Sequence, residues 1–198
     1  WLLSKTALNG KTSSFALELP PYRRPQIGKV IVRSVLDRTL FVLGRAAAVA
    51  APAGLVIWLL ANCSVDGQTL LRLICSALDP FAQLFGIDGV ILTALILSFP
   101  ANEIFLPLIL MGYLQSAALT EVSLTELHSL LFSQGWTVWT ALAVMVLCLF
   151  HWPCSTTLLT IRKETGRLRW CALSALLPTA VGFLLCALLQ LVRLLAVG

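Results

Sequence analysis

Four long apolar segments constrain this chain more strongly than any other feature of its sequence. They span residues 40–61, 89–114, 136–161 and 170–192. A helix needs about 20 residues to cross the hydrocarbon core of a bilayer, and each segment is long enough. Because backbone groups in lipid must be satisfied internally, such spans form helices. The sequence therefore predicts an all-α, polytopic helical membrane protein.

The composition agrees with a membrane environment. Of the 198 residues, 59% are hydrophobic and 12% are charged, and the mean hydropathy is +0.92. A soluble domain carries about 25% charged residues, so about half of the expected charge is missing. The net charge of +5 lies in clusters that flank the apolar segments, which argues against nucleic-acid binding. The expected partner is the lipid bilayer.

The region before the first apolar segment divides into two parts. Residues 1–26 contain three prolines between positions 20 and 25, so we expect an irregular cytoplasmic lead segment. Residues 27–39 place apolar side chains on one helical face and charged ones, at every fourth residue from Lys29, on the other. This pattern predicts an amphipathic interfacial helix at the start of a membrane domain over 27–198. An exposed helix of a soluble domain is the alternative.

Lysine and arginine counts predict the orientation of the segments. Residues 22–38 hold five basic residues and 162–169 hold four, whereas the loop 62–88 holds one and the loop 115–135 none. Because cytoplasmic loops are enriched in basic residues, both clusters are expected inside and both loops outside. Two straight crossings before the second loop would instead put it inside. Either residues 89–114 form a broken, re-entrant hairpin, or the later basic cluster departs from the rule.

The six cysteines do not form a disulfide framework. No two of them are spaced as Cys-x-x-Cys, and most lie inside apolar runs, where a free cysteine behaves as a small hydrophobic residue. A bridge between Cys63 and Cys75 in a non-cytoplasmic loop is the one pairing that the sequence leaves open.

Two apolar segments are interrupted by the same order of residue types: aromatic, proline, small, polar, polar. The first interruption is Phe-Pro-Ala-Asn-Glu at 99–103, and the second is Trp-Pro-Cys-Ser-Thr at 152–156. Each proline removes the hydrogen bond to the carbonyl four residues earlier, here Ile96 and Leu149. Freed carbonyls in lipid persist where the backbone lines a cavity or binds an ion. The pair predicts Pro-broken or re-entrant helices around a transport site; a simple kink at each proline is the alternative.

The polar residues at the two interruptions are suited to a passing cation. Glu103 supplies a negative charge, Asn102 an amide oxygen and Cys154 a thiol. Ser155 and Thr156 supply hydroxyl groups as weaker contacts. Mixed sulfur and oxygen ligands suit first-row divalent metals better than Mg²⁺ or Ca²⁺. We therefore predict a metal pathway lined by these five residues.

Each of these assignments has a structural alternative. A carboxyl group in an apolar segment is functional by default, but Glu103 could pair with Arg45 or stay protonated. Arg45 itself is expected to extend its charged end back to the headgroups. Cys154 could simply pack, as buried cysteines usually do. His151, three residues before Cys154, is interpreted as interfacial rather than as a metal ligand.

Nothing in the sequence indicates an enzyme. Gly10-Lys11-Thr12 resembles the end of a phosphate-binding loop, but the glycine required five residues before Gly10 is Lys5. No combination of serine, histidine and aspartate, and no pair of acids, indicates a catalytic site. We therefore expect neither a catalytic residue nor a nucleotide site in this chain.

Three stretches of the sequence together resemble one known family. Residues 15–23 contain Glu-Leu-Pro-Pro-Tyr-Arg, residues 99–104 read Phe-Pro-Ala-Asn-Glu-Ile, and residues 153–166 begin with Pro-Cys-Ser-Thr-Thr and end with Glu-Thr-Gly. In this order they resemble segments before and within the second gate-type helical block of FeoB, a family of ferrous-iron transporters. The similarity spans nearly the whole chain, which therefore resembles the C-terminal permease portion of that family.

The resemblance implies a function that composition does not show. FeoB-type proteins import Fe²⁺, their transported substrate, across the bacterial inner membrane as multi-pass proteins. Their G domain, which uses GTP and Mg²⁺, and their first gate block have no counterpart in this sequence, which starts at Trp1 and is expected to be a fragment. The resemblance also assigns the metal-handling thiol of the second block to Cys154 and implies a small FeoA-like partner.

Two alternatives to a ferrous-iron permease stay open on the sequence. A gate-type permease could carry another substrate, such as a nucleoside or another divalent metal. The chain could also be a non-transporting fragment of a split transporter.

Overall fold

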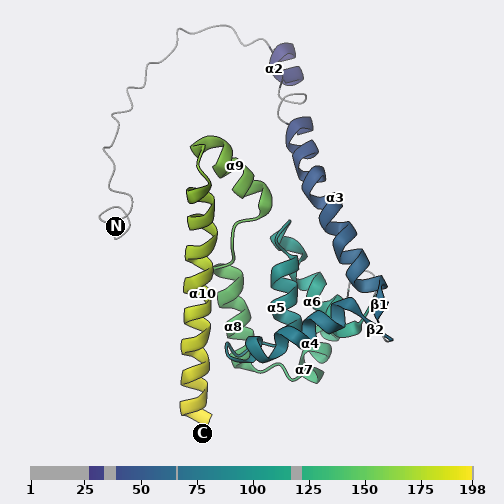
Figure 1. Cartoon of the computed structure of the whole chain (residues 1–198), viewed down its shortest axis with the longest axis vertical. Coiled ribbons are helices and arrows are strands. Elements are labelled where there is room, and N and C mark those ends of the chain that lie inside the picture. The colour runs from purple at the N-terminus through teal and green to yellow at the C-terminus, as the bar shows by residue number, and fades with distance from the viewer. Residues whose placement is uncertain (1–26, 34–38, 66, 117–121, 198) are drawn as a thin grey trace, which may run out of the picture. The chain divides into compact units, whose positions relative to one another are not determined.

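A computed structural model describes residues 27–33, 39–65, 67–116 and 122–197. The chain divides into two units, Trp1–Leu40 and Phe41–Gly198. In the first unit, helix α2 covers Ile27–Arg33 and ends on a basic residue (Figure 1). The expected lead segment 1–26 and residues 34–38 of the expected interfacial helix lie outside the described residues. The interfacial helix therefore stays a prediction.

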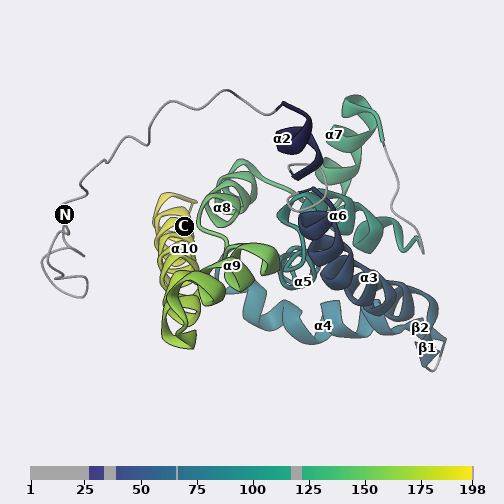
Figure 2. The same cartoon turned by 90° about the horizontal axis from the view of Figure 1, so that it is seen from above.

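The described part of the second unit is mostly helical (Figures 1 and 2). The helices are α3 (Phe41–Asn62), α4 (Leu70–Gln83), α5 (Gly89–Leu97), the 3₁₀ turn η2 (Asn102–Ile104), α6 (Phe105–Leu114), α7 (Leu124–Ser133), α8 (Val138–Leu149), α9 (Ser155–Thr165) and α10 (Leu168–Val197). Strands β1 (Ser64–Val65) and β2 (Gln68–Thr69) pair antiparallel, with Ser64 opposite Thr69. The predicted all-α membrane fold is confirmed.

Among the described residues, two helices are long and apolar enough to cross a membrane, Val42–Asn62 within α3 and Leu168–Ala196 within α10. Helices α7 and α8 are bent by 114° at a short break and make a third candidate if they count as one span. With 30 residues, α10 is about 45 Å long at the usual rise of about 1.5 Å per residue. This length exceeds the roughly 30 Å hydrocarbon core, so α10 tilts or extends beyond it.

Residues 89–114 fold back on themselves as a hairpin of α5 and α6. The first turn of α5 lies against the last turn of α6, because a Cβ atom added to Gly112 would come within 2.5 Å of the Val90 side chain. The Tyr113 hydroxyl donates to the Asp88 carboxylate, which also accepts from the Ile91 N–H at 2.8 Å and so caps α5. The hairpin geometry is that of the re-entrant alternative left open by the charge counts.

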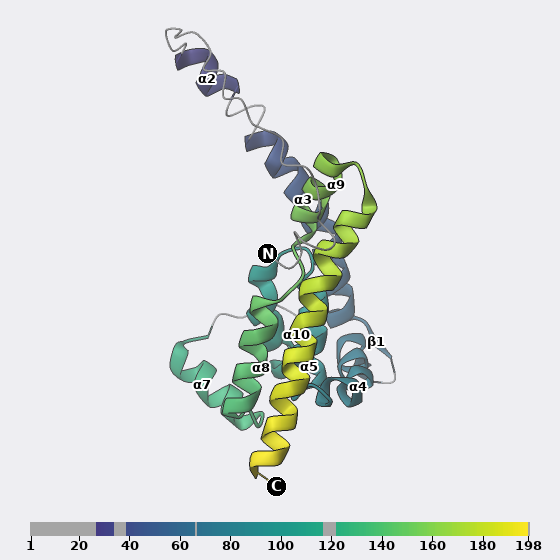
Figure 3. The same ribbon diagram turned by 90° about the vertical axis from the view of Figure 1, so that its left-hand side faces the viewer.

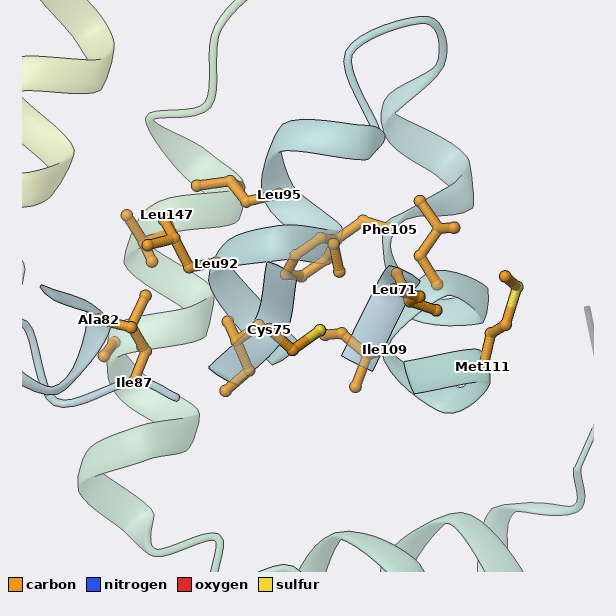
Figure 4. Packing of buried hydrophobic residues seen from close by; sticks show 14 of the residues in the cluster. Leu71, Cys75, Ala82, Ile87, Leu92, Leu95, Phe105, Ile109, Met111 and Leu147 are labelled. Carbon is orange, nitrogen blue, oxygen red and sulfur yellow. The ribbon is translucent and has the colours of Figure 1, made fainter. Parts of the chain in front are cut away.

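The buried core lies where α4 crosses the open end of this hairpin and α8 packs beside it (Figure 4). Its labelled members come from these helices and from the turn after α4: Leu71, Cys75, Ala82, Ile87, Leu92, Leu95, Phe105, Ile109, Met111 and Leu147. The approach of α4 to α5 requires a glycine, since a Cβ atom on Gly89 would lie 1.9 Å from the Cys75 carbonyl oxygen. In membranes such close backbone approach holds helices together.

Helix α10 packs along α8 and connects to α9 through a tight turn. The Cys186 thiol is fully buried and donates to the Ala143 carbonyl at 3.5 Å, and Gly182 lies against Phe150. Gly166, with a φ of +65°, ends α9 in the left-handed region that glycine adopts at least cost. Cys63 is exposed and Cys75 buried, and both are free, so the bridge left open by the sequence does not form.

The α9–α10 turn and the α4 region lie at opposite ends of the second unit (Figures 1 and 3). The turn carries four exposed basic residues within 162–169, whereas α4 and the β-hairpin belong to the basic-poor loop 62–88. With a hairpin at 89–114, helix α7 also falls at the α4 end (Figure 1). The side of the membrane that each end faces stays a prediction from the positive-inside bias.

Candidate functional site at two helix breaks

The first predicted interruption is a real break in the helix. α5 ends at Leu97, a turn covers 98–100, Ala101 is extended, and α6 begins at Phe105 after η2. The Ile96 carbonyl, expected to be freed by Pro100, accepts from the Phe99 N–H at 3.3 Å instead. The Leu95 carbonyl accepts from the Ser98 hydroxyl at 2.8 Å. The turn therefore satisfies most of the carbonyls that the break releases.

The second predicted interruption is also a break. α8 ends at Leu149, residues 151–154 have no regular structure, and α9 begins at Ser155. Cys154 is the N-cap residue of α9 and makes no side-chain capping bond. Proline does not cause such breaks by itself, because α3 and α10 continue across Pro52 and Pro178.

The two breaks contact each other through Ser155. Its backbone N–H donates to the Phe99 carbonyl at 3.1 Å, and its hydroxyl donates to the Pro100 carbonyl at 3.2 Å. The side chain is 6% exposed. The Asn102 amide lies 3.5 Å from the Trp152 carbonyl, at the limit of a hydrogen bond. We refer to residues 98–102 together with 151–155 as the break junction.

His151 adds a further contact across the break junction. Its Nε2 lies 3.3 Å from the Leu95 carbonyl oxygen and 3.4 Å from Ser98 Oγ, and its ring packs 4.6 Å from the ring of Trp152. The Leu95 contact fits a ring nitrogen that carries the proton. The indole N–H of Trp152 is buried without a hydrogen-bond partner among the described residues. The sequence interpretation of His151 as interfacial did not anticipate this position beside the end of α5.

The five predicted metal contacts fall into separate groups. Asn102 and Ser155 contact the opposite break, whereas Cys154 Sγ contacts its own segment, 3.1 Å from Thr156 Oγ1 and 3.1 Å from Thr157 Oγ1. Glu103 is exposed on η2 and makes no hydrogen bond or ion pair with the described residues. Within the described ranges, no three His, Cys, Asp or Glu residues are arranged to hold a metal ion. These residues by themselves therefore do not enclose an ion.

Arg45 contacts α9 rather than Glu103. Its Nη2 donates to the Thr156 carbonyl at 3.0 Å and to Thr160 Oγ1 at 2.8 Å. The alternative in which Glu103 pairs with Arg45 is therefore not the arrangement observed.

Cavities flank both breaks. One, of about 310 Å³, lies between α3 and the first break and is lined by small or apolar residues that include Ala50, Gly54, Pro100, Ala101 and Met111. Another, of about 240 Å³, borders Arg45, Thr156, Thr157 and Thr160. The backbone at the breaks therefore borders open volume, as the helix-break argument requires.

Two sequence families match parts of this chain. Residues 43–168, which contain both breaks, match the Gate family, described as nucleoside recognition. The chain belongs to the Gate family. Residues 1–37 of this Gate chain match a second family, described as the C terminus of ferrous iron transport protein B.

The relatives of this Gate chain agree with the resemblance to FeoB. The Fe(2+) transporter FeoB of Staphylococcus aureus (strain MSSA476) is 28% identical over 192 residues, which are 93% of this chain and 27% of the relative. The Fe(2+) transporter FeoB of Synechocystis is 28% identical over 176 residues, 86% of this chain and 27% of the relative. The chain thus spans about a quarter of the length of these proteins. The resemblance to the C-terminal part of FeoB is confirmed, and no solved structure matches the chain.

Sequence reasoning missed a polar network at the open end of the hairpin in the Gate chain. Trp136 Nε1 donates to the Tyr113 hydroxyl at 2.7 Å, and Tyr113 donates to Asp88. Asp79 accepts from the Gly89 N–H at 2.8 Å. The signal that could have found it is an aspartate directly before Gly89 and an apolar run, which is typical of an N-cap. The network joins α4, α5 and α6 and gives the hairpin a fixed open end.

Proposed function

We propose that this chain is the C-terminal permease part of a transporter that imports Fe²⁺ across the bacterial inner membrane. The direct contact of the two helix breaks through Ser155 carries the proposal. Irregular backbone at membrane depth is tolerated where it lines a cavity or a pathway, and paired broken helices are typical of transporter sites. The names of the relatives supply the identity of the substrate, Fe²⁺.

The proposed pathway uses four of the five predicted residues, in two groups, because the Ser155 hydroxyl is bonded to the Pro100 carbonyl. Asn102 and Glu103 offer oxygen ligands on one side of the break junction, and Cys154 with the Thr156 hydroxyl offers a thiol and an oxygen on the other. Neither group encloses an ion, and weak, separate contacts let an ion leave as well as enter. A facing segment from the rest of the transporter, such as the first gate block, would complete each group.

The proposal also includes what lies outside this chain. Transport would be linked to GTP hydrolysis, with Mg²⁺, in a G domain elsewhere in the same transporter, and a FeoA-like small protein is the expected soluble partner. The basic α9–α10 turn would face the cytoplasm, and α4 with the loop 115–135 would face the outside. Helix α3 supports the need for further segments, because an 18-residue apolar stretch of it contains no buried residue.

The experiment is uptake of radioactive iron by cells that carry the intact transporter. Cys154→Ser combined with Glu103→Gln is expected to reduce uptake to background while the protein is still present in the membrane. The matched control is Cys63→Ser combined with Glu164→Gln, which changes an exposed thiol and an exposed acid away from the break junction. Unchanged uptake in the first variant would remove both residues from the mechanism. Uptake of a nucleoside in place of iron would replace the proposed substrate.

A further inference from the structure

Arg45 is the single charged residue of α3, and it points to another helix. A charge in a membrane helix is costly and marks a functional role unless it reaches water. The Arg45 guanidinium donates to the Thr156 carbonyl at 3.0 Å and to Thr160 Oγ1 at 2.8 Å. In the described part of α3, no other side chain hydrogen-bonds to a different helix. The polar link between α3 and α9 thus depends on this one residue.

The contact closes a small triangle at the start of α9. Thr160 Oγ1 also donates to the Thr156 carbonyl, at 2.9 Å, so Arg45 and Thr160 share one acceptor and contact each other. Hydrogen bonds from a charged donor are stronger than neutral ones. Together with the two Ser155 bonds to the first break, this triangle ties the first turn of α9 to neighbouring segments.

The same turn of α9 holds the thiol. Thr156, whose carbonyl binds Arg45, places its hydroxyl 3.1 Å from Cys154 Sγ, and the Thr157 hydroxyl lies at the same distance. Arg45 therefore acts on Cys154 through one intervening residue. The pocket of about 240 Å³ that borders Arg45, Thr156 and Thr157 leaves room beside this turn.

We propose that Arg45 is a positioning residue, which fixes the first turn of α9 so that Thr156 and Thr157 hold the Cys154 thiol at the second break. The role of the positioned thiol in transport rests on the proposed function, whereas the contact between Arg45 and α9 is given by the hydrogen bonds. The guanidinium also places a fixed positive charge beside the pathway. Like charges repel, so this charge shortens the residence of a divalent cation near the thiol and favours its release.

The test is the rate at which N-ethylmaleimide alkylates each cysteine of the intact transporter in membranes, measured by peptide mass spectrometry. Arg45→Gln is expected to slow alkylation of Cys154 by about ten-fold, the scale of one hydrogen bond from a charged group. The rate at Cys63, exposed beyond the far end of α3, is expected to stay unchanged. Both bonds come from one nitrogen, Nη2, so Arg45→Lys keeps a charged donor and is expected to restore part of the rate.

Two further variants keep the proposal falsifiable if Arg45→Gln folds poorly. Thr160→Val removes the second acceptor of Arg45 and is expected to slow the alkylation of Cys154, as Arg45→Gln does. The double variant Arg45→Gln/Thr160→Val is expected to slow Cys154 alkylation little more than either single change, because both changes act through one contact. Arg193→Gln is the matched control, since Arg193 lies near the other end of α10 and contacts Gln190 of the same helix. It is expected to leave the Cys154 rate unchanged.

The outcomes separate this proposal from the transport function. Equal Cys154 rates in the wild type, Arg45→Gln and Thr160→Val overturn the positioning role. If iron uptake needs Cys154 but the rate of Cys154 alkylation is the same in Arg45→Gln, the positioning role is rejected and the transport function is unaffected. If Cys154 alkylation depends on Arg45 but iron uptake does not need Cys154, the contact between Arg45 and α9 is supported and the transport role of the thiol is rejected.

Discussion

The Ser155 hydroxyl donates to the Pro100 carbonyl at 3.2 Å, and this bond joins two helix breaks that are 55 residues apart in the sequence. The backbone N–H of Ser155 supplies a second bond, to the Phe99 carbonyl at 3.1 Å. Ser155 was predicted as a weak metal contact. Its buried position favours a structural part in the site, because its proton is used to satisfy a carbonyl of the first break.

Ser155→Ala is expected to lower stability by about 1–2 kcal/mol, because the Pro100 carbonyl loses its donor in a buried site. Iron uptake is expected to fall with it, since the breaks lose a bond that holds them together. Denaturant unfolding of the purified protein in detergent measures the first effect. Ser174→Ala is the matched control, since that hydroxyl bonds only within α10, to the Cys171 carbonyl. Equal stability of the two variants would show that the Ser155 bond is unimportant.

Tyr113→Phe is expected to destabilise the hairpin by about 1–3 kcal/mol, because the change removes the donor to Asp88 and the acceptor of Trp136 Nε1 at once. Trp136→Phe removes one member of the same network. The double variant is expected to cost less than the sum of the single changes, which a thermal unfolding series measures. Additive costs would mean that the three side chains do not act as a unit.

Gly89→Ala is expected to cost about 3 kcal/mol or more, because the new Cβ atom would lie 1.9 Å from the Cys75 carbonyl, a backbone atom that cannot move freely. Gly44→Ala in α3 meets nothing within 4 Å and is the control. It is expected to be neutral or to stabilise the helix by about 1 kcal/mol. The yield and unfolding midpoint of both proteins measure the difference, and a well-folded Gly89→Ala protein would contradict the close packing of α4 on α5.

The re-entrant hairpin predicts that Cys63 and a cysteine at Gln134 face the same side of the membrane. Both are expected to react with a membrane-impermeant maleimide added outside, in a protein whose other exposed cysteine, Cys148, is replaced by serine. A cysteine at Arg167 is expected to react only after the cells are opened. Labelling of positions 63 and 134 from opposite sides would show that residues 89–114 cross the membrane.

Local patterns allowed the breaks to be predicted. Phe-Pro-Ala-Asn-Glu and Trp-Pro-Cys-Ser-Thr each combine a proline with polar neighbours inside an apolar segment, and each proves to be a break. Pro52 and Pro178, which are not followed by two successive polar residues, lie in continuous helices. What could not be predicted is how the released carbonyls are satisfied. Ile96 uses its own turn, whereas Phe99 and Pro100 use Ser155, and such pairing depends on atoms brought together by the fold.

The sequence by itself determined the membrane environment, the helical class and the family, because apolar segment length, missing charge and short motifs are local properties. It also placed the two breaks. Only the tertiary structure decided that residues 89–114 form a hairpin and that Arg45 binds α9 instead of Glu103. The physical reason is that hydropathy records how much a segment prefers lipid, while hydrogen bonds between helices depend on which side chains the packing brings within about 3 Å.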